Sequence, residues 1–162
     1  MTSTPVYLSL GSNLGDRAEN LRAALAALPA AGFQPARASA LYETEPVDYL
    51  DQPWFLNCAA AGETSLAPHE LLHNLRGIEA ALGSAKAFAK GPRLLDIDIL
   101  VYGDAVLATP ELQVPHPRML ERRFVLAPLA EIAPHLRHPL WDADVSQLLS
   151  QLEDTSVVRR VP

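Results

Sequence analysis

The sequence contains only one cysteine, Cys58, among its 162 residues. A single thiol excludes an intrachain disulfide and the usual zinc site with several cysteine ligands, so the chain suits a reducing compartment. The sequence also lacks a basic segment followed by an apolar one at its start. It has no run near the ~18 apolar residues that a bilayer-spanning helix needs. We therefore expect a soluble, cytoplasmic protein with no membrane partner.

The chain also lacks an excess of basic residues, because 13 Lys and Arg face 19 Asp and Glu and the formal net charge is −6. A broad nucleic-acid-binding surface needs such an excess to displace counterions, so we expect no nucleic-acid partner. Six of the 13 basic residues nevertheless lie in less than a quarter of the chain: Lys86, Lys90, Arg93, Arg118, Arg122 and Arg123. This clustering fits a local anion-binding site, and it fits a solvated rim of surface charge equally well.

The composition is that of an ordinary globular domain, with 49% hydrophobic and 20% charged residues. Such a chain is long enough and apolar enough to bury a core without a disulfide or a metal. We find no internal repeat, low-complexity tract or shift in composition. The sequence therefore predicts one domain over residues 1–162.

The first half of the chain predicts a strand, a helix and then two strands. An apolar run over 6–10 reads as a strand, and a helix follows from the capping-box spacing of Asp16 and Glu19. Residues 33–42 and 55–64 read as two strands, which we expect to pair antiparallel. The connection between them, residues 44–54, is long for a hairpin and carries two prolines, so we interpret it as one wall of a functional site.

The second half begins with a helix from Pro68 to Gly83, in which leucine and isoleucine recur at helical spacing. A strand over 95–102 follows, which completes the order β-α-β-β-α-β. That order is typical of an α+β, ferredoxin-like sandwich, with an antiparallel sheet and helices on one face. We expect a C-terminal extension beyond it, with a helical segment over 119–132 and an amphipathic turn over 145–152.

The strand that begins with Asp96-Ile97-Asp98-Ile99 carries the strongest chemical signal. Residues two apart on a strand share a face, with roughly 7 Å between their α-carbons. The two carboxylates therefore lie on one side, and the isoleucines face the core. Adjacent like charges repel, and a divalent cation such as Mg²⁺ would neutralise them. Arg93, just before the strand, suits a bidentate contact with a phosphate. An edge strand with an acidic outer face would explain the same spacing.

The run from Gly91-Pro92-Arg93 to Asp96-Ile97-Asp98 closely resembles the signature of the hydroxymethyldihydropterin pyrophosphokinase family. Other matching pieces occur in the same order: Gly11-Ser12-Asn13-Leu14, Tyr42-Glu43-Thr44-Glu45-Pro46, Asp51-Gln52-Pro53, Phe55-Leu56-Asn57, Val114-Pro115-His116 and Arg122-Arg123-Phe124. The resemblance covers nearly the whole chain. It implies the same ferredoxin-like fold that the element order predicts.

The resemblance also implies an activity: Mg²⁺-dependent transfer of a pyrophosphoryl group from ATP to the hydroxymethyl group of 6-hydroxymethyl-7,8-dihydropterin, with release of AMP. Asp96 and Asp98 would hold two Mg²⁺ ions, and ATP would be the co-substrate. The pterin site would comprise Thr44, Pro46, Val47, Phe55, Asn57 and Phe124. The ATP site would comprise Glu79, Arg93, Ile99, His116 and Arg122. We expect a monomer whose partners are these two small molecules.

Two of these assignments have ordinary alternatives. Phe55 at strand spacing is also compatible with a core aromatic, and Glu79 at helical spacing is compatible with an exposed residue. The family resemblance favours the functional interpretation of Phe55.

The chain departs from the family pattern in the loop before Gly91. Ser84 stands where the family usually has an arginine, and Ala89-Lys90 replaces a basic-aromatic pair. Lys86 is the candidate to supply the missing charge, and we count it with Asp96, Asp98 and Arg93 as catalytic, although lysine cannot reproduce a bidentate contact. Two hypotheses follow: an active pyrophosphokinase, or a non-catalytic or altered-specificity paralogue that binds a pterin or nucleotide.

Overall fold

The computed structural model describes residues 2–83 and 92–162. In chain order the elements of the first part are β1 (Thr4–Ser12), α1 (Arg17–Ala27), β2 (Gln34–Ala38), β3 (Tyr42–Thr44), β4 (Phe55–Thr64), α2 (Pro68–Ala81) and β5 (Asp96–Tyr102). The elements that follow are β6 (Leu107–Ala108), β7 (Gln113–Val114), α3 (Arg123–Ile132), α4 (Val145–Ser150) and β8 (Val158–Arg160). Short 3-10 turns cover Pro29–Ala31 and Met119–Glu121.

The sheet has the strand order β5-β1-β4-β3-β8, and all neighbours are antiparallel. The strand expected over 33–42 is divided into β2 and β3, and both pair with β4 as predicted. Without the short β8, this order is that of the ferredoxin-like sandwich. The predicted α+β fold class is confirmed.

Local sequence signals account for the helix boundaries. The Asp16 carboxylate accepts a hydrogen bond from the Glu19 backbone N–H at 3.1 Å, which caps α1. Pro68 occupies the first turn of α2, and Gly83 ends it with a φ of 80° that favours glycine. Both helices therefore begin where their caps predict.

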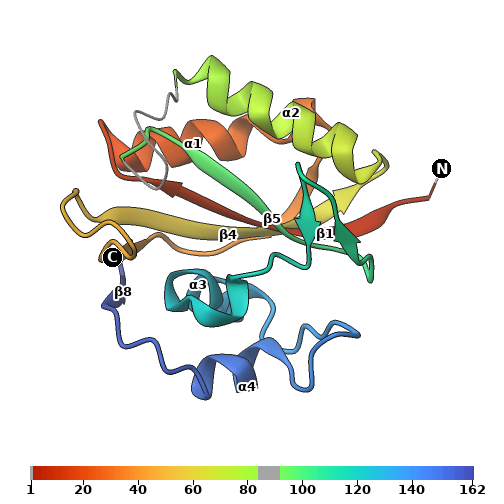
Figure 1. The fold of residues 1–162 in the computed structure, drawn as a ribbon. Helices are drawn as coiled ribbons and strands as arrows, with labels where there is room; N and C mark the ends of the chain where they lie inside the picture. The colour runs from red at the N-terminus through yellow and green to blue at the C-terminus, as the bar shows by residue number, and fades with distance from the viewer. Residues whose placement is uncertain (1, 84–91) are drawn as a thin grey trace.

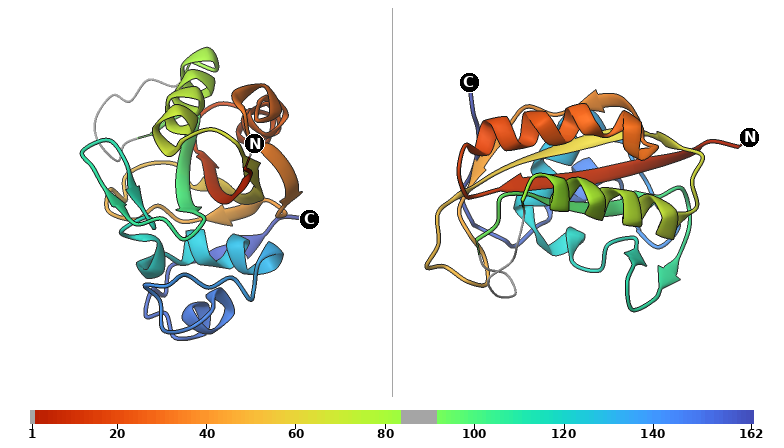
Figure 2. Two further views of the ribbon diagram at one scale, coloured as in Figure 1. Left: turned by 90° about the vertical axis from the view of Figure 1, so that its right-hand side faces the viewer. Right: turned by 90° about the horizontal axis from the view of Figure 1, so that it is seen from above.

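Alternation along the strands separates two apolar cores. Leu56, Cys58 and Ala60 of β4 face the core beneath α1 and α2, whereas Ala59 and Ala61 face the core beneath α3. Figures 1 and 2 show the resulting layers, with α1 and α2 on one side of the sheet and α3 and α4 on the other. The predicted C-terminal extension thus covers the second face of the sheet.

The C-terminal extension also contains strands that the sequence analysis missed. The β6–β7 hairpin lies in the proline-rich stretch, and β8 pairs with β3 at the edge of the sheet. These strands are two or three residues long, too short for a recognisable alternation. Within the described ranges, no helix is long and apolar enough to span a membrane.

Candidate active site

The site begins with three neighbouring strands whose outward side chains meet on one face. In the sheet register, Ser9 of β1 lies opposite Asp98 of β5, and Gly11 lies between Asp96 on one side and Asn57 on the other. A Cβ at Gly11 would lie 2.4 Å from the Asn57 Oδ1. Glycine is therefore required here, because any side chain would displace the amide.

A pocket lies over this face, between the 44–54 connection and the start of α3. Its lining includes every residue expected at the pterin: Thr44, Pro46, Val47, Phe55, Asn57 and Phe124. It also includes Arg93, Asp96, Asp98 and Arg122. The 44–54 connection thus lies where the sequence analysis expected a wall of a site.

Asn57 is held in a fixed orientation within this pocket. Its Nδ2 donates a hydrogen bond of 2.6 Å to the Thr44 Oγ1, and both residues are buried. Phe55 comes from the start of β4 and Phe124 from the first turn of α3, so aromatic rings enter the pocket from two different elements. An oriented amide beside aromatic rings suits a flat heterocycle with polar edges.

The acidic pair lies on the floor of the same pocket. The Arg93 guanidinium lies 3.2 Å from the Asp96 Oδ2. Burial and the neighbouring charge of Asp96 raise the pKa of the Asp98 carboxyl group to about 7. Two close, partly buried carboxylates fit the oxygen-donor set of a divalent cation that would stabilise their charge.

No cluster of three or more His, Cys, Asp or Glu side chains suitable for a metal occurs in residues 2–83 and 92–162. A cation at Asp96 and Asp98 would therefore take its other ligands from water or a substrate. This is the usual coordination of Mg²⁺ beside phosphates. The residues present thus fit Mg²⁺ better than a metal that needs a full protein cage.

A second pocket lies beside the first, and Asp98 lines both. Ile99 and His116, two of the residues expected at ATP, line this second pocket. The His116 Nδ1 accepts a hydrogen bond from the Arg118 backbone N–H at 3.2 Å. Burial and the charge of Arg122 lower the pKa of His116, which favours the neutral ring.

Arg122 lines the first pocket. Its guanidinium lies 3.5 Å from the Asp48 Oδ2 and 5.5 Å from the centre of the Phe124 ring. Burial, together with the charge of Arg118, lowers the pKa of Arg122. Among the described residues, its buried Nε has no hydrogen-bond partner. Asp48 thus compensates the positive charge of Arg122 only in part, and the guanidinium faces a pocket that could receive an anion.

One expected residue, Glu79, lies elsewhere. Glu79, on α2, is not among the described residues that line the two pockets, and its Oε2 accepts a hydrogen bond of 2.8 Å from the Ile97 backbone N–H. Burial raises the pKa of Glu79. Lys86 lies outside the described residues, as do Ser84 and Ala89-Lys90.

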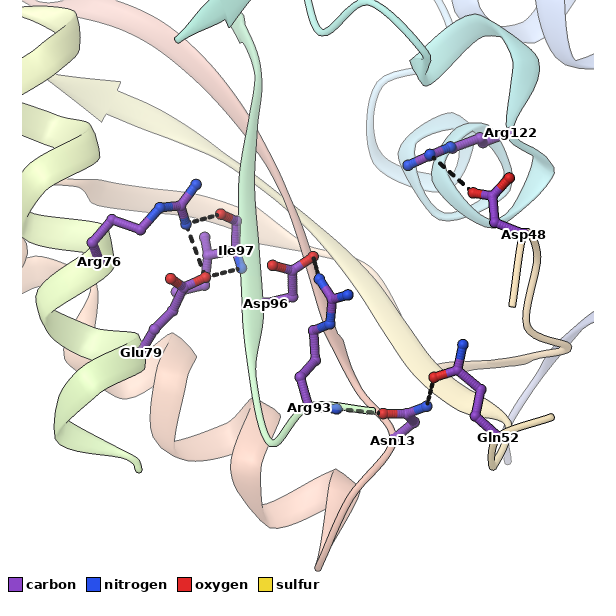
Figure 3. Close-up of polar contacts among 9 residues, drawn as sticks. All are labelled: Asn13, Asp48, Gln52, Arg76, Glu79, Arg93, Asp96, Ile97 and Arg122. Atoms are coloured by element: carbon purple, nitrogen blue, oxygen red, sulfur yellow. Dashed lines mark hydrogen bonds and ion pairs between the residues drawn. The ribbon is translucent and has the colours of Figure 1, made fainter. Parts of the chain in front are cut away.

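Asn13 is a site residue to which the sequence analysis assigned no role. Its side-chain Oδ1 accepts a bond from the Arg93 backbone N–H at 2.9 Å, and its Nδ2 donates to the Gln52 Oε1 at 2.9 Å (Figure 3). Asn13 thereby joins the segment before β5 to the 44–54 connection. The signal for it was the Gly11-Ser12-Asn13 turn after the first strand, which the family resemblance includes.

Comparisons with known proteins agree with this geometry. The family described as 7,8-dihydro-6-hydroxymethylpterin-pyrophosphokinase matches residues 7–134. A 2-amino-4-hydroxy-6-hydroxymethyldihydropteridine pyrophosphokinase of Bacillus subtilis is 46% identical over 142 residues, which is 87% of this chain and 85% of the relative. The protein of the same description from Methylorubrum extorquens is 45% identical over 159 residues, which is 96% and 98% of the two chains.

Other relatives are much longer than this chain. A folic acid synthesis protein of Pneumocystis carinii is 40% identical over 157 residues, and the match covers 97% of this chain but only 21% of that protein. A crystal structure of an HPPK-DHPS protein in complex with substrates superimposes with a TM-score of 0.73 over 93% of this chain and 43% of the other. At 13% identity, this last likeness bears on the fold alone.

Proposed function

Because the chain belongs to the 7,8-dihydro-6-hydroxymethylpterin-pyrophosphokinase family, we propose that it transfers a pyrophosphoryl group from ATP to 6-hydroxymethyl-7,8-dihydropterin. The observation that carries this proposal is the position of Asp98, which lines both an aromatic pocket with an oriented amide and a second pocket beside a histidine. In this reaction the pterin hydroxymethyl oxygen forms a bond to the β-phosphorus of ATP. The bond from that phosphorus to the α-phosphate oxygen breaks, and AMP leaves.

The pterin would occupy the first of the two pockets. Phe55 and Phe124 would stack on the flat ring, and Asn57 would form hydrogen bonds to its amino and lactam edge. The bond from Asn57 to Thr44 supports this assignment, because an amide already oriented by a neighbour loses little entropy on binding.

ATP would occupy the second pocket and extend its phosphates toward Asp98. Ile97 directs its backbone N–H and C=O away from β1, so strand alternation directs those of Ile99 the same way, toward that pocket. The adenine base of ATP could form hydrogen bonds to these backbone groups of Ile99. Arg93, His116 and Arg122 would contact the phosphates, and Asn13 would keep Arg93 in position through its backbone N–H.

Asp96 and Asp98 would hold Mg²⁺, and we propose two ions. When bound, such ions compensate the charge of the phosphates and lower the pKa of the attacking hydroxyl group. The chain therefore needs no strong general base. Its own contributions are to orient the pterin through Asn57, to hold the carboxylates beside both pockets, and to keep Arg93 and Arg122 near the phosphates.

We propose that one copy of the chain is sufficient, because its fold brings the residues expected at the pterin and at the cation together in the first pocket. Neither the described residues nor the comparisons favour the alternative of a non-catalytic paralogue. A binding module would have no evident use for two neighbouring carboxylates in the first pocket.

The direct test is to incubate the purified protein with ATP, Mg²⁺ and the hydroxymethyldihydropterin. We expect AMP and the pterin diphosphate in equal amounts, and no product when EDTA removes the metal. Release of ADP in place of AMP would contradict pyrophosphoryl transfer. Binding of pterin and nucleotide without any product would support the non-catalytic alternative.

A further inference from the structure

Two side chains of α2 hold the backbone of one residue of β5, Ile97. The Arg76 Nη1 donates a hydrogen bond of 2.8 Å to the Ile97 carbonyl oxygen, and the Ile97 N–H donates one of 2.8 Å to the Glu79 Oε2. The two side chains also pair with each other at 2.9 Å. Figure 3 shows both of them reaching from α2 to the same point on β5. We call this arrangement the Arg76–Glu79 clip.

The Arg76–Glu79 clip supplies the hydrogen bonds that a further neighbouring strand would otherwise make with Ile97. β5 is the last strand of the sheet on its side, and antiparallel alternation directs the N–H and C=O of Ile97 away from β1. An edge strand leaves such groups unpaired unless another element supplies a donor and an acceptor. Arg76 and Glu79, one helical turn apart, supply both to the same residue.

The clipped residue lies between the two acidic ones. The Ile97 side chain is fully buried beneath α2, so both its peptide groups and its side chain are held. The backbone angles of Ile97 decide how the flanking carboxylates of Asp96 and Asp98 are directed. Mg²⁺ requires nearly ideal octahedral geometry, so small changes in these directions weaken its binding.

We propose that Arg76 and Glu79 are positioning residues, which hold the backbone C=O and N–H of Ile97 and thereby direct the Asp96 and Asp98 carboxylates for a divalent cation. This inference rests on the proposed function, because it concerns the same cation site. It gives Glu79 a role different from direct contact with ATP. It also gives a role to Arg76, for which the sequence provided no signal.

The surroundings of Glu79 favour this role over the alternatives. Its side chain is only 13% exposed, which excludes an ordinary surface residue. Its Oε2 already receives the Ile97 N–H and the Arg76 guanidinium. A carboxylate occupied in this way is well placed to orient the strand.

The test compares Glu79→Ala with Glu79→Gln. Glutamine keeps an oxygen that can accept the Ile97 N–H, whereas alanine removes it. Mn²⁺ binding is measured by electron paramagnetic resonance with an unreactive ATP analogue present, and the exchange rate of the Ile97 amide is measured by NMR. Arg76→Met and the exposed control His73→Ala, on the same helix, complete the set.

We expect Glu79→Ala to weaken Mn²⁺ binding by about tenfold or more, because residues that orient metal ligands typically contribute that much. Ile97 amide exchange should become faster, and pterin affinity should change less than twofold. Glu79→Gln should recover most of both losses. Because Arg76 also lines the second pocket, Arg76→Met is compared at saturating analogue, where Mn²⁺ binding should still weaken. His73→Ala should resemble the wild type.

Three outcomes would overturn the inference. Unchanged Mn²⁺ binding and Ile97 exchange in Glu79→Ala would show that the clip positions nothing. A loss of analogue affinity at saturating Mn²⁺, with exchange unchanged, would show a direct nucleotide contact. A common loss of stability, pterin binding and metal binding without recovery in Glu79→Gln would show a purely structural role. If the wild type binds Mn²⁺ but forms no AMP, the proposed function fails, and the metal and exchange data still decide the clip.

Discussion

Asp98 differs from an ordinary strand residue in the surroundings of its carboxyl group. β5 is an edge strand, as the alternative interpretation of the acidic spacing supposed. Its acidic face is nevertheless part of a pocket, and burial raises the pKa of Asp98. Acidic side chains on an exposed edge would remain fully solvated, so the pocket favours a functional role.

Replacing either carboxylate tests that role. We expect Asp96→Asn and Asp98→Asn each to lower turnover by at least about a hundredfold, because a lost metal ligand removes charge compensation from the transition state. The measurement is the rate of AMP formation at saturating ATP and Mg²⁺. Asp104→Asn, an exposed change just beyond β5, is the matched control. Wild-type rates in Asp96→Asn or Asp98→Asn would exclude them as metal ligands.

Gly11 provides a second test, directed at the pterin. In Gly11→Ala the new Cβ would meet the Asn57 Oδ1 at 2.4 Å, so the amide must move away from its bond to Thr44. A misplaced recognition group of this kind costs about 1–3 kcal/mol. We therefore expect pterin affinity, titrated by pterin fluorescence, to fall by roughly tenfold or more. Nucleotide affinity should fall much less, and an equal loss for both ligands would point to general misfolding.

Protonation of the His116 ring makes the stability of the folded protein depend on pH. Its pKa is lowered below 6.5 by burial and by Arg122, so the folded protein takes up this proton less readily than the unfolded chain. The stability that depends on the neutral ring is therefore complete above pH 6.5 and is lost as the pH falls through the folded-state pKa. We expect an NMR titration to place His116 below 6.5 and His116→Gln to flatten the acid side of the stability profile. An imidazole that titrates above 6.5 would contradict this.

At the scale of elements, α2 has three separate tasks. Its leucines cover one core, its Arg76 and Glu79 hold β5, and its end at Gly83 begins the segment that leads to Arg93. α2 must therefore be stable, and its C-terminal end must form at the correct residue. Gly77, within the helix, and Gly83, just beyond its end, test these two properties separately.

We expect Gly77→Ala to stabilise the protein by about 0.5–1 kcal/mol, because glycine is a poor helix former. A Cβ at Gly77 would meet no atom within 4 Å, so nothing offsets that gain. Gly83→Ala should instead destabilise by about 1 kcal/mol, because Gly83 has a φ of 80°. Urea unfolding of the two variants is the measurement, and a gain from Gly83→Ala would mean that the helix end relaxes without strain.

At the scale of the whole molecule, β4 connects the two layers. It pairs with β1, β2 and β3, and its two sides contribute to the cores on opposite faces of the sheet. Loosening either layer therefore disturbs this strand. We expect the described parts of the chain to unfold cooperatively.

Cys58, in the middle of β4, reports on this cooperativity. Its side chain is fully buried, and burial raises the pKa of the thiol to about 12, so the reactive thiolate is suppressed. We expect a thiol reagent to modify the native protein only through global unfolding. The free energy of opening, calculated from the labelling rates, should then equal the free energy of unfolding measured by circular dichroism. A much smaller value from labelling would reveal a local opening of β4.

The sequence by itself determined the features that depend on neighbouring residues. The capping residue Asp16, the helical leucines of α2 and the alternation of Asp96-Ile97-Asp98 act within a few positions of the chain, so their geometry could be predicted. The element order then restricted the fold to a ferredoxin-like sandwich. The functional assignment came from the resemblance of whole motifs to a family, with its residues in the same order.

The tertiary structure alone decided which distant residues meet. The bond from Arg93 to Asn13 joins residues 80 positions apart, and the pairing of Glu43 with Arg159 joins residues 116 apart. The covering of the second face by α3 and the clip on Ile97 are of the same kind. Such contacts depend on packing and on a sheet edge that exists only after folding, because no periodicity along the chain encodes the distance between two elements.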